Sequence, residues 1–242
     1  LPKRQDELSI NGHAIEARLY AEDPAKGFLP STGRLECLDF GLSYRIDTGV
    51  AEGAEVSPFY DPMIAKVIAF ASDRDDAIDA LIDSMRGLQV WPIRTNAAFL
   101  RRCADHPDFR AADLDTGFIA RNENELIPAD EASEAEWQAA AGFALADQSA
   151  EADYLPQGFR LNAPSAARVA LNHAGETRVI ERAGSTVPIH SDFETMMLAG
   201  GPENARTFSA KVSDDEIVLF SEGRAIGFSR AVRGTGQASA AD

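Results

Sequence analysis

The spacing of hydrophobic side chains in the first part of the chain switches between the period of a strand and that of a helix. Apolar and polar residues alternate over 13–20, which predicts a strand with one polar face. Residues 64–70 are apolar at nearly every position, as is typical of a strand covered on both faces. Two further strands are predicted at 34–38 and 44–50.

Two helices are predicted after these strands, because apolar residues recur there at intervals of three and four. The first extends to Leu88, and Ser72 or Asp73 is its candidate N-cap. The second covers 95–103 and is expected to end at Pro107, which a helix interior does not tolerate.

The pattern changes after residue 128. Short helical turns at 109–126 lead into an acidic, alanine-rich helix at 130–148, where Ser133 and Glu136 have the spacing of a capping box. The Gly/Ala/Ser-rich end, 234–242, is expected to be a linker. Between them, short strand-like segments separated by turn residues predict an antiparallel barrel or sandwich. These segments are 159–162, 167–172, 178–182, 185–189, 207–212, 216–220 and 225–230.

Composition and charge narrow the class of protein. Hydrophobic residues make up 45% of the 242 positions and charged residues 26%, as in a folded protein of one large or two small domains. No apolar run reaches the roughly 20 residues of a membrane span, so no membrane partner is expected. The net charge of −16 argues against nucleic acid as a partner, although one local basic site can still bind an anion. Two cysteines are too few for a disulfide framework, and a reducing compartment is expected.

Several kinds of chemistry have no motif in this sequence. It contains no glycine-rich nucleotide fingerprint, no Walker-type phosphate loop and no Gly-x-Ser-x-Gly elbow. The four histidines share no ligand spacing with either cysteine, which argues against a metal site. Residues 193–197 have the methionines of a biotin-attachment sequence but no lysine between them, so a packed strand or bend is expected there.

Four short blocks resemble the C-terminal domain of biotin carboxylases, and they occur in the order and spacing of that family. They are 12–24 (GHAIEARLYAEDP), 28–33 (FLPSTG), 57–66 (SPFYDPMIAK) and 95–96 (TN).

Further blocks narrow this resemblance. Residues 33–35, 95–102 and 114–119 most resemble α subunits of methylcrotonyl-CoA carboxylase, followed by those of propionyl-CoA and geranyl-CoA carboxylase. Residues 158–162 resemble the start of the mediating domain of the BT type, which docks the carboxyltransferase β subunit in such enzymes.

The resemblance implies an α+β fold in three parts. A biotin carboxylase C-terminal domain, an antiparallel sheet with helices, is expected at 1–128. A helix followed by an antiparallel β-barrel, the mediating domain, is expected at 129–233, and the linker follows at 234–242. The ATP-grasp part, which binds ATP and Mg²⁺, is expected before Leu1. The biotin carrier domain is expected after Asp242. Because the ATP-grasp site is expected to lie outside this chain, the chain is expected to be inactive by itself.

The implied function is that of a ligase. The family uses ATP and bicarbonate to carboxylate biotin, and the carboxyl group is later transferred to an acyl-CoA such as 3-methylcrotonyl-CoA. The implied partners are the carboxyltransferase β subunit, the biotin carrier domain and bicarbonate, in a homo- or hetero-oligomer. The implied compartment is the bacterial cytoplasm or the mitochondrial matrix. The acyl group is chosen by the β subunit, which is another chain.

The resemblance also assigns site residues. Arg18 aligns with the arginine that stabilises negative charge on the ureido oxygen of biotin, and it is expected to project into an open groove. A surface ion pair with Glu16 is the structural alternative for Arg18. Glu16 itself either orients Arg18 or is a solvated carboxylate. Asp61 is either a partner near the biotin pocket or a turn aspartate before proline. Lys66 is expected to pair with an acid, and a catalytic role is the alternative.

Two other functions remain open from the sequence. The chain, and residues 129–242 in particular, could be a non-catalytic assembly module that docks a carboxyltransferase β subunit. An unrelated all-β binding protein is the third candidate, and it predicts no arginine in a biotin cleft.

Overall fold

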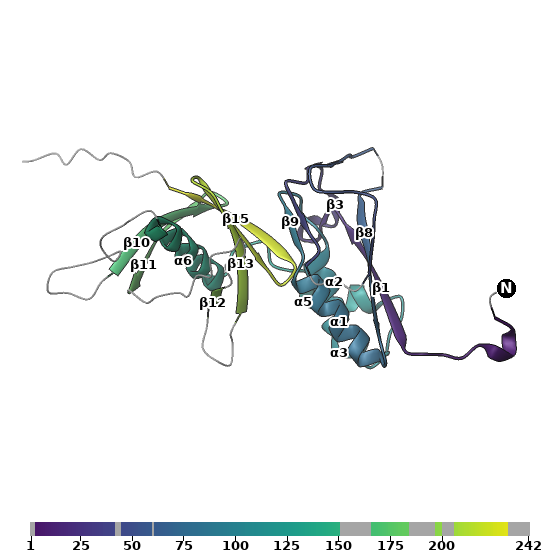
Figure 1. Cartoon of the computed structure of the whole chain (residues 1–242). Helices are drawn as coiled ribbons and strands as arrows, with labels where there is room; N and C mark the ends of the chain where they lie inside the picture. The colour runs from purple at the N-terminus through teal and green to yellow at the C-terminus, as the bar shows by residue number, and fades with distance from the viewer. Residues whose placement is uncertain are drawn as a thin grey trace, which may run out of the picture. The chain divides into compact units, whose positions relative to one another are not determined.

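The computed structural model describes residues 3–41, 45–59, 61–150, 166–183, 197–199 and 206–231. The chain divides into two compact units, and their elements are labelled in Figure 1. The first unit comprises residues 1–130 and 222–225, and the second comprises 131–221 and 226–242. In the described part of the chain, no helix is long and apolar enough to cross a membrane.

A three-stranded antiparallel sheet is the centre of the first unit. Its order is β1 (His13–Tyr20), β8 (Met63–Ala71) and β6 (Arg45–Thr48), so β8 is the middle strand. The alternation of β1 was predicted with the same bounds, and β8 extends the predicted 64–70 by one residue at each end. Leu19 and Val67 lie on the face that joins the hydrophobic core.

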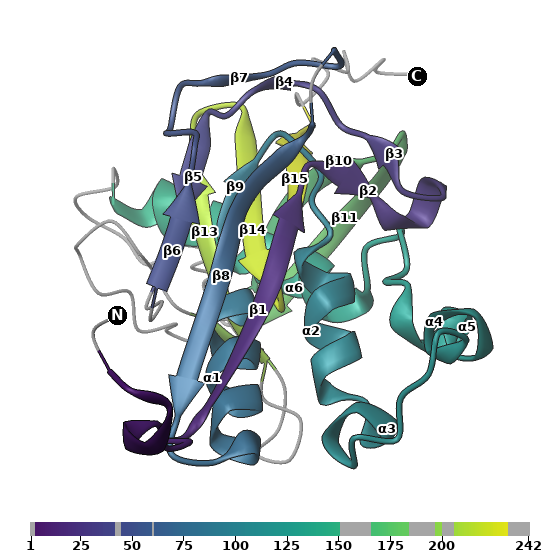
Figure 2. The ribbon, with the colours of Figure 1, turned by 90° about the vertical axis from the view of Figure 1, so that its right-hand side faces the viewer.

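Helix α1 (Arg74–Arg86) covers that face of the sheet, as Figure 2 shows. It begins as predicted at Asp73, whose side chain accepts a hydrogen bond from the backbone N–H of Asp76. Helix α2 (Ala97–Asp105) packs beside α1. As predicted, this helix ends before Pro107, and His106 is its C-cap. Pro107 also opens α3 (Pro107–Arg110), because proline is well suited to the first position of a helix.

The rest of the first unit consists of short elements. The predicted strand at 34–38 is two separate strands, because residues between them leave the extended ladder. Three small antiparallel pairs are β2 (Glu22–Asp23) with β3 (Leu29–Pro30), β4 (Gly33–Arg34) with β7 (Glu55–Val56), and β5 (Cys37–Asp39) with β9 (Gln89–Trp91). The short helices are η1 (Gln5–Glu7), η2 (Pro24–Lys26), α4 (Phe118–Arg121) and α5 (Glu123–Leu126).

The second unit packs one helix, α6 (Glu134–Ala150), against an antiparallel sheet. The predicted capping box is present, since Glu136 Oε2 accepts hydrogen bonds from the backbone N–H and the hydroxyl of Ser133, at 2.6 and 2.7 Å. Trp137, Phe208 and Phe228 are buried between helix and sheet. The sheet order is β11 (Glu176–Ala183), β10 (Ala166–His173), β15 (Arg224–Arg230), β14 (Glu216–Ser221), β13 (Arg206–Val212) and β12 (Met197–Ala199).

The fold class, α+β, agrees with the prediction, whereas closure of the second sheet into a barrel is not seen among the described strands. There β11 and β12 are the two edges of an open sheet. The strands expected at 159–162 and 185–189 and the linker at 234–242 lie outside the described residues, as does all but the last position of 193–197.

Candidate functional site

Two of the three candidate site residues, Arg18 and Glu16, lie on the exposed face of β1. The two-residue period of the strand places them together, while Ala17 and Leu19 are buried on the other side. Arg18 Nε donates a hydrogen bond to Glu16 Oε1 at 3.3 Å. The two side chains remain 59% and 41% exposed. The ion pair therefore orients a guanidinium that is still accessible to a ligand.

Glu16 also stabilises the protonated, positively charged form of Arg18. Its hydrogen bond raises the pKa of the Arg18 guanidinium above the ordinary value, and Tyr20 adds to the effect. The group therefore stays cationic at every physiological pH. A fixed guanidinium can hold an anion through forked donors, or stabilise negative charge that develops on an oxygen atom.

Asn96 fixes the backbone of the strand on both sides of Leu19, and its role was not predicted. Its amide Nδ2 donates to the carbonyl oxygen of Arg18 at 3.2 Å, and its Oδ1 accepts from the N–H of Tyr20 at 2.9 Å. The N–H of Asn96 itself donates to the carbonyl oxygen of Tyr20 at 3.2 Å. Asn96 is only 6% exposed, so these bonds are shielded from water. The sequence places residues 95–96 at the start of a predicted helix and in the family resemblance, but nothing local in it indicates a contact across 76 residues.

Asp61 precedes β8 and lies at the same end of the sheet as Tyr20. Its Oδ1 accepts a hydrogen bond from the N–H of Met63 at 3.2 Å, which is the turn role foreseen as one alternative. The charge of Asp61 also contributes to raising the pKa of the Glu22 carboxyl, after the larger effect of burial. Among the described residues, no hydrogen bond or ion pair joins Asp61 to Arg18.

Lys66 lies directly opposite Arg18 in the pairing of β1 with β8. On its other side it is opposite Asp47 of β6. The expected ion pair is absent in the described structure, since no carboxylate oxygen lies within 4.0 Å of the Lys66 ammonium. Asp47 is instead held by Arg45, through two hydrogen bonds of 3.0 Å each.

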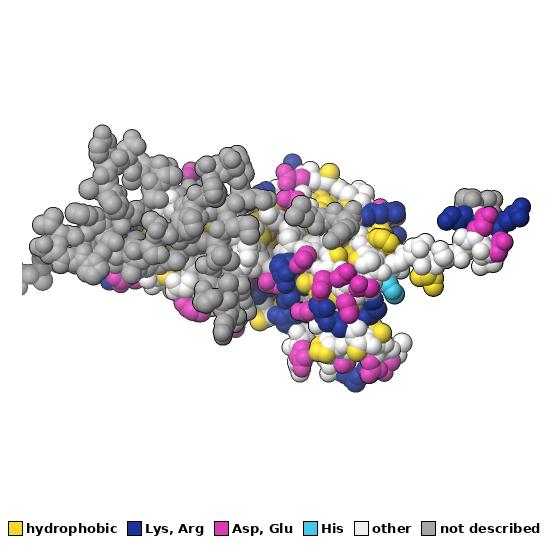
Figure 3. All heavy atoms as spheres, turned by 60° about the horizontal axis from the view of Figure 1, so that its bottom comes forward, with side chains coloured by type: hydrophobic (Ala, Val, Ile, Leu, Met, Phe, Trp, Pro, Cys, Tyr) yellow, Lys and Arg dark blue, Asp and Glu magenta, His cyan; other side chains and the backbone are white. Residues whose placement is uncertain are grey.

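Arginines on the short helices of the first unit form ion pairs with aspartates. Arg110 donates to Asp79 at 2.7 Å and to Asp105 at 3.0 Å. Arg121 pairs with Asp115 at 2.8 Å. The face shown in Figure 3 has basic and acidic side chains side by side, as such pairs require. Each of these arginines is paired with at least one nearby acid.

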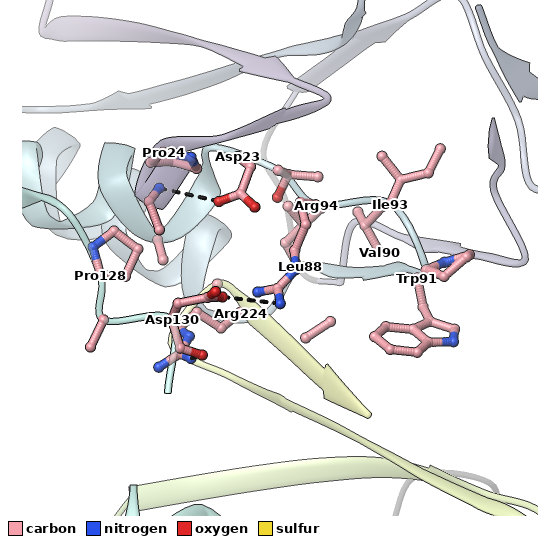
Figure 4. Close-up of a pocket in the computed structure, with 17 residues that line it drawn as sticks. Asp23, Pro24, Leu88, Val90, Trp91, Ile93, Arg94, Pro128, Asp130 and Arg224 are labelled. Atoms are coloured by element: carbon pink, nitrogen blue, oxygen red, sulfur yellow. Dashed lines mark hydrogen bonds and ion pairs between the residues drawn. The ribbon is translucent and has the colours of Figure 1, made fainter. Parts of the chain in front are cut away.

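A small pocket in the first unit lies away from the candidate residues. Its walls include Leu88 and Val90, and the ion pair of Arg94 with Asp130, at 3.1 Å, closes one side (Figure 4). Its volume of about 40 Å³ is enough for a few water molecules and too small for a ring-shaped cofactor. Arg18, Glu16 and Asp61 do not line this pocket. Arg18 thus lies on an open face of the sheet, and the groove expected around it is not formed by this pocket.

Thiol and metal chemistry have no support in the described residues. No three or more histidine, cysteine or acidic side chains gather there as metal ligands. Cys37 is buried and Cys103 is half-buried, and neither forms a disulfide. Burial raises the pKa of the Cys103 thiol to about 12, so this thiol stays protonated and unreactive.

The comparison with protein families matches the part of the chain that carries these residues. Residues 16–121 match the family model of the biotin carboxylase C-terminal domain. The chain is 42% identical over 153 residues to the mitochondrial methylcrotonoyl-CoA carboxylase subunit alpha of Rattus norvegicus, and this covers 61% of the chain and 21% of the relative. It is 40% identical over 138 residues to the propionyl-CoA carboxylase alpha chain of Ruegeria pomeroyi, covering 48% of the chain and 20% of the relative. The chain thus spans about a fifth of the length of these curated relatives.

Solved structures agree with the family match. The biotin carboxylase subunit of a pyruvate carboxylase is 31% identical, with a TM-score of 0.51 over 54% of this chain and 29% of that one. The biotin carboxylase domain dimer of the Hydrogenobacter thermophilus 2-oxoglutarate carboxylase is 29% identical, with a TM-score of 0.51 and the same coverage. That structure contains bicarbonate, ADP and Mg-ADP.

Proposed function

Because residues 16–121 match the family model of the biotin carboxylase C-terminal domain, we propose that the chain is part of the α subunit of a biotin-dependent acyl-CoA carboxylase. The identities of about 40% to α subunits of this kind support the proposal. Within the intact enzyme, the chain would contribute to the ATP- and bicarbonate-dependent carboxylation of biotin. The reaction class is that of a ligase.

Arg18 is the residue that we assign to the chemistry. Biotin, when bound, would supply a ureido nitrogen as the nucleophile, and removal of the proton from that nitrogen would place negative charge on the ureido oxygen. The Arg18 guanidinium donates hydrogen bonds to that oxygen or to bicarbonate, because it is exposed and permanently charged. Glu16 sets the direction of the guanidinium, and Asn96 fixes the strand beneath it. Asp61 is proposed to border the biotin pocket, next to Glu22.

The observation that carries this proposal is an exposed guanidinium whose side chain and backbone are both fixed. In the full-length α subunit, Arg18→Ala should lower biotin carboxylation by roughly 100-fold or more, as with other preorganised donors. The measurement is bicarbonate-dependent ATP cleavage that requires biotin. Arg45→Ala is the matched control, because Arg45 is an exposed arginine of the same sheet that is paired with an acid two positions away. Equal activities of Arg18→Ala and the wild type would remove Arg18 from the mechanism.

ATP and Mg²⁺ are proposed to bind elsewhere in the α subunit. Residues 16–121 match the C-terminal domain of biotin carboxylases, and the chain spans about a fifth of its curated relatives, which supports this division. We therefore expect the 242-residue chain by itself to show no biotin-dependent ATP cleavage. ATP-dependent carboxylation of free biotin by this chain would contradict the assignment.

The acyl-CoA substrate is proposed to be 3-methylcrotonyl-CoA, with propionyl-CoA or geranyl-CoA as alternatives. The supporting observation is an identity of 42% to a methylcrotonoyl-CoA carboxylase relative, against 40% to a propionyl-CoA carboxylase relative. Assays of the assembled enzyme with each acyl-CoA decide between them, and the β subunit is expected to set the preference.

A second role, assembly, is proposed for residues 129–233. They are proposed to form a mediating domain that docks a carboxyltransferase β subunit. Two observations support it. The second unit has a hydrophobic core of its own, around Trp137 and Phe228, and its described residues include no metal-binding cluster. A pull-down of the β subunit by the whole chain should survive Arg18→Ala, because that change leaves the second unit untouched. Loss of β-subunit binding in that variant would place the docking surface in the first unit.

A further inference from the structure

We propose that Lys66 is a second cation of the Arg18 site, and that Lys66 and Arg18 together bind a small oxyanion on the exposed face of the β1–β8 sheet. The oxyanion has the chemistry shared by bicarbonate and inorganic phosphate: compact, negatively charged and with several acceptor oxygens. The assignment of bicarbonate as the natural ligand rests on the proposed function, whereas the binding of an oxyanion does not.

The register of the sheet brings the two cations together. Arg18 and Lys66 are directly opposite residues of the antiparallel pair β1–β8. Directly opposite residues point to the same face, with Cβ atoms roughly 4.5–5.5 Å apart. Arg18 is exposed, and Lys66, on the middle strand, is half-buried. The flexible Lys66 side chain can therefore approach any anion that the forked guanidinium of Arg18 holds.

The acids around this pair do not neutralise Lys66. Glu16 is hydrogen bonded to Arg18. Asp47, which is opposite Lys66 on β6, is occupied by Arg45 through both of its carboxylate oxygens. Within the described residues, no ion pair to a carboxylate reaches Lys66. Its electrostatic effect on Asp47 acts at longer range.

Two like charges at directly opposite positions destabilise a strand pair. This arrangement stands out in a chain of net charge −16, where acids outnumber bases by 39 to 23 and a partner for a lysine is easily found. An oxyanion between the two groups turns the repulsion into two charge-assisted contacts. Arginine provides forked donors and lysine a compact point charge, a combination that suits one ligand with several oxygens.

The first experiment measures anion binding by the 242-residue chain. Thermal unfolding at low ionic strength is followed with added bicarbonate, inorganic phosphate, or sodium chloride at matched ionic strength. Lys66→Met keeps the apolar stem and removes the charge. We expect it to leave Tm unchanged or to raise it, and to weaken the binding of bicarbonate and phosphate by about tenfold. Lys26→Met is the matched control, because Lys26 has an acid partner, Asp23, at 3.3 Å. That variant should keep the anion response and lose a little stability.

The outcomes separate the alternatives. Stabilisation of the wild type by both oxyanions, but not by chloride, supports a shared oxyanion site. Stabilisation by bicarbonate alone supports the site and identifies the source of the ligand. If Lys66→Met responds to the oxyanions as the wild type does, or if the wild type responds only as it does to chloride, the proposal is overturned.

The second experiment uses the assembled carboxylase. Lys66→Met should raise KM for bicarbonate by about tenfold with a smaller change in kcat, and Lys66→Arg should restore most of the affinity. A purely structural role would not produce this split or the rescue. If Arg18→Ala leaves carboxylation intact, the proposed function fails while the anion titration of the chain still stands. If Arg18→Ala abolishes carboxylation but Lys66→Met leaves KM for bicarbonate unchanged, only the role of Lys66 fails.

Discussion

The sheet of the first unit and the helix-covered sheet of the second each hold an arginine, Arg18 and Arg178, in a different way. The sheet of the first unit has a covered face of small and branched apolar residues and an exposed face that carries Glu16, Arg18 and Lys66. In the second unit, the charged side chain of Arg178 packs against an aromatic ring. Arg178 lies over the ring of Trp137, at 4.8 Å from its centre, and donates hydrogen bonds to Glu134 and Glu176. Arg178 is thus engaged by two carboxylates and a ring, whereas Arg18 has a single carboxylate partner.

This difference suggests a division of labour between Arg18 and Arg178. A charged group that takes part in chemistry must keep unsatisfied donors, and a group that holds a fold must not. Arg18 has one carboxylate partner and remains 59% exposed, while Arg178 has two carboxylate partners and a ring beneath it. The predictions below test whether chemistry and packing are separated in this way.

The largest expected effect on stability is in the second unit. Phe228 is fully buried, with its ring 4.9 Å from that of Trp137. Phe228→Ala should cost roughly 3–5 kcal/mol of unfolding free energy, because it leaves a cavity between helix and sheet. The two tryptophans report on the units separately, Trp91 on the first and Trp137 on the second. In a denaturant titration followed by NMR of the indole N–H groups, the Trp137 transition should shift much further than that of Trp91.

The control for this experiment is Phe59→Ala, since Phe59 is 95% exposed. It should change the stability by no more than about 0.5 kcal/mol. Equal shifts at both tryptophans in Phe228→Ala would show that the units unfold as one, and the comparison between them would lose its basis.

A smaller effect is expected from Asn96, which joins packing to chemistry in the first unit. Asn96→Ala should cost about 1–3 kcal/mol, because it leaves the Arg18 carbonyl and the Tyr20 N–H without their side-chain partners. Asn96→Asp keeps an acceptor for Tyr20 and loses the donor to Arg18, so its cost should be lower. The Tyr20 amide should exchange its hydrogen faster in Asn96→Ala than in Asn96→Asp.

Asn122→Ala is the control for Asn96, because Asn122 makes a local hydrogen bond to Phe118, four residues away. It should leave exchange at Tyr20 unchanged. If the Tyr20 amide exchanges at the wild-type rate in Asn96→Ala, Asn96 does not hold the strand that positions Arg18.

The parts of this structure that were predictable from sequence are those with a repeating pattern. The alternation of 13–20 and the helical spacing after Asp73 specify β1 and α1 nearly to the residue, because each period fixes which side chains are buried. The ladder of Gly33–Arg34 with Glu55–Val56 is too short to have a period, and its partner strand is distant in sequence. Only Arg34 of this ladder was therefore predicted to lie in a strand, as part of the longer segment 34–38.

The contacts of the candidate site also separate into those that follow from a repeating pattern and those that do not. Arg18 and Glu16 share a face because they are two residues apart on a strand, so their contact could be expected from sequence. The position of Lys66 opposite Arg18 depends on the register of two strands that are nearly fifty residues apart, and the clamp by Asn96 depends on a turn from another part of the unit. The sequence around Lys66 and around Asn96 contains no pattern that predicts these contacts. Contacts of this kind become visible only when the strands are paired.

The smallest expected effect concerns the carboxyl groups at the end of the sheet. Burial raises the pKa of Glu22 above its ordinary 4.5, and the charge of Asp61 raises it further. A carboxyl with a raised pKa binds its proton more tightly in the folded chain. Its contribution to stability is therefore complete below about pH 4.5 and is lost as the pH rises through the raised value. Asp61→Asn should lower the pKa of Glu22 only part of the way, since burial is the larger cause.

An NMR titration of the Glu22 carboxyl measures this shift directly. Asp47→Asn is the control, because Asp47 lies on β6 and its own pKa is lowered mainly by the hydrogen bond from Arg45. It should leave Glu22 unaffected. A Glu22 pKa that is the same in Asp61→Asn and in the wild type would mean that Asp61 is not close to Glu22 in solution. Asp61 would then be a turn residue alone, and the site would be reduced to the strand face that carries Arg18.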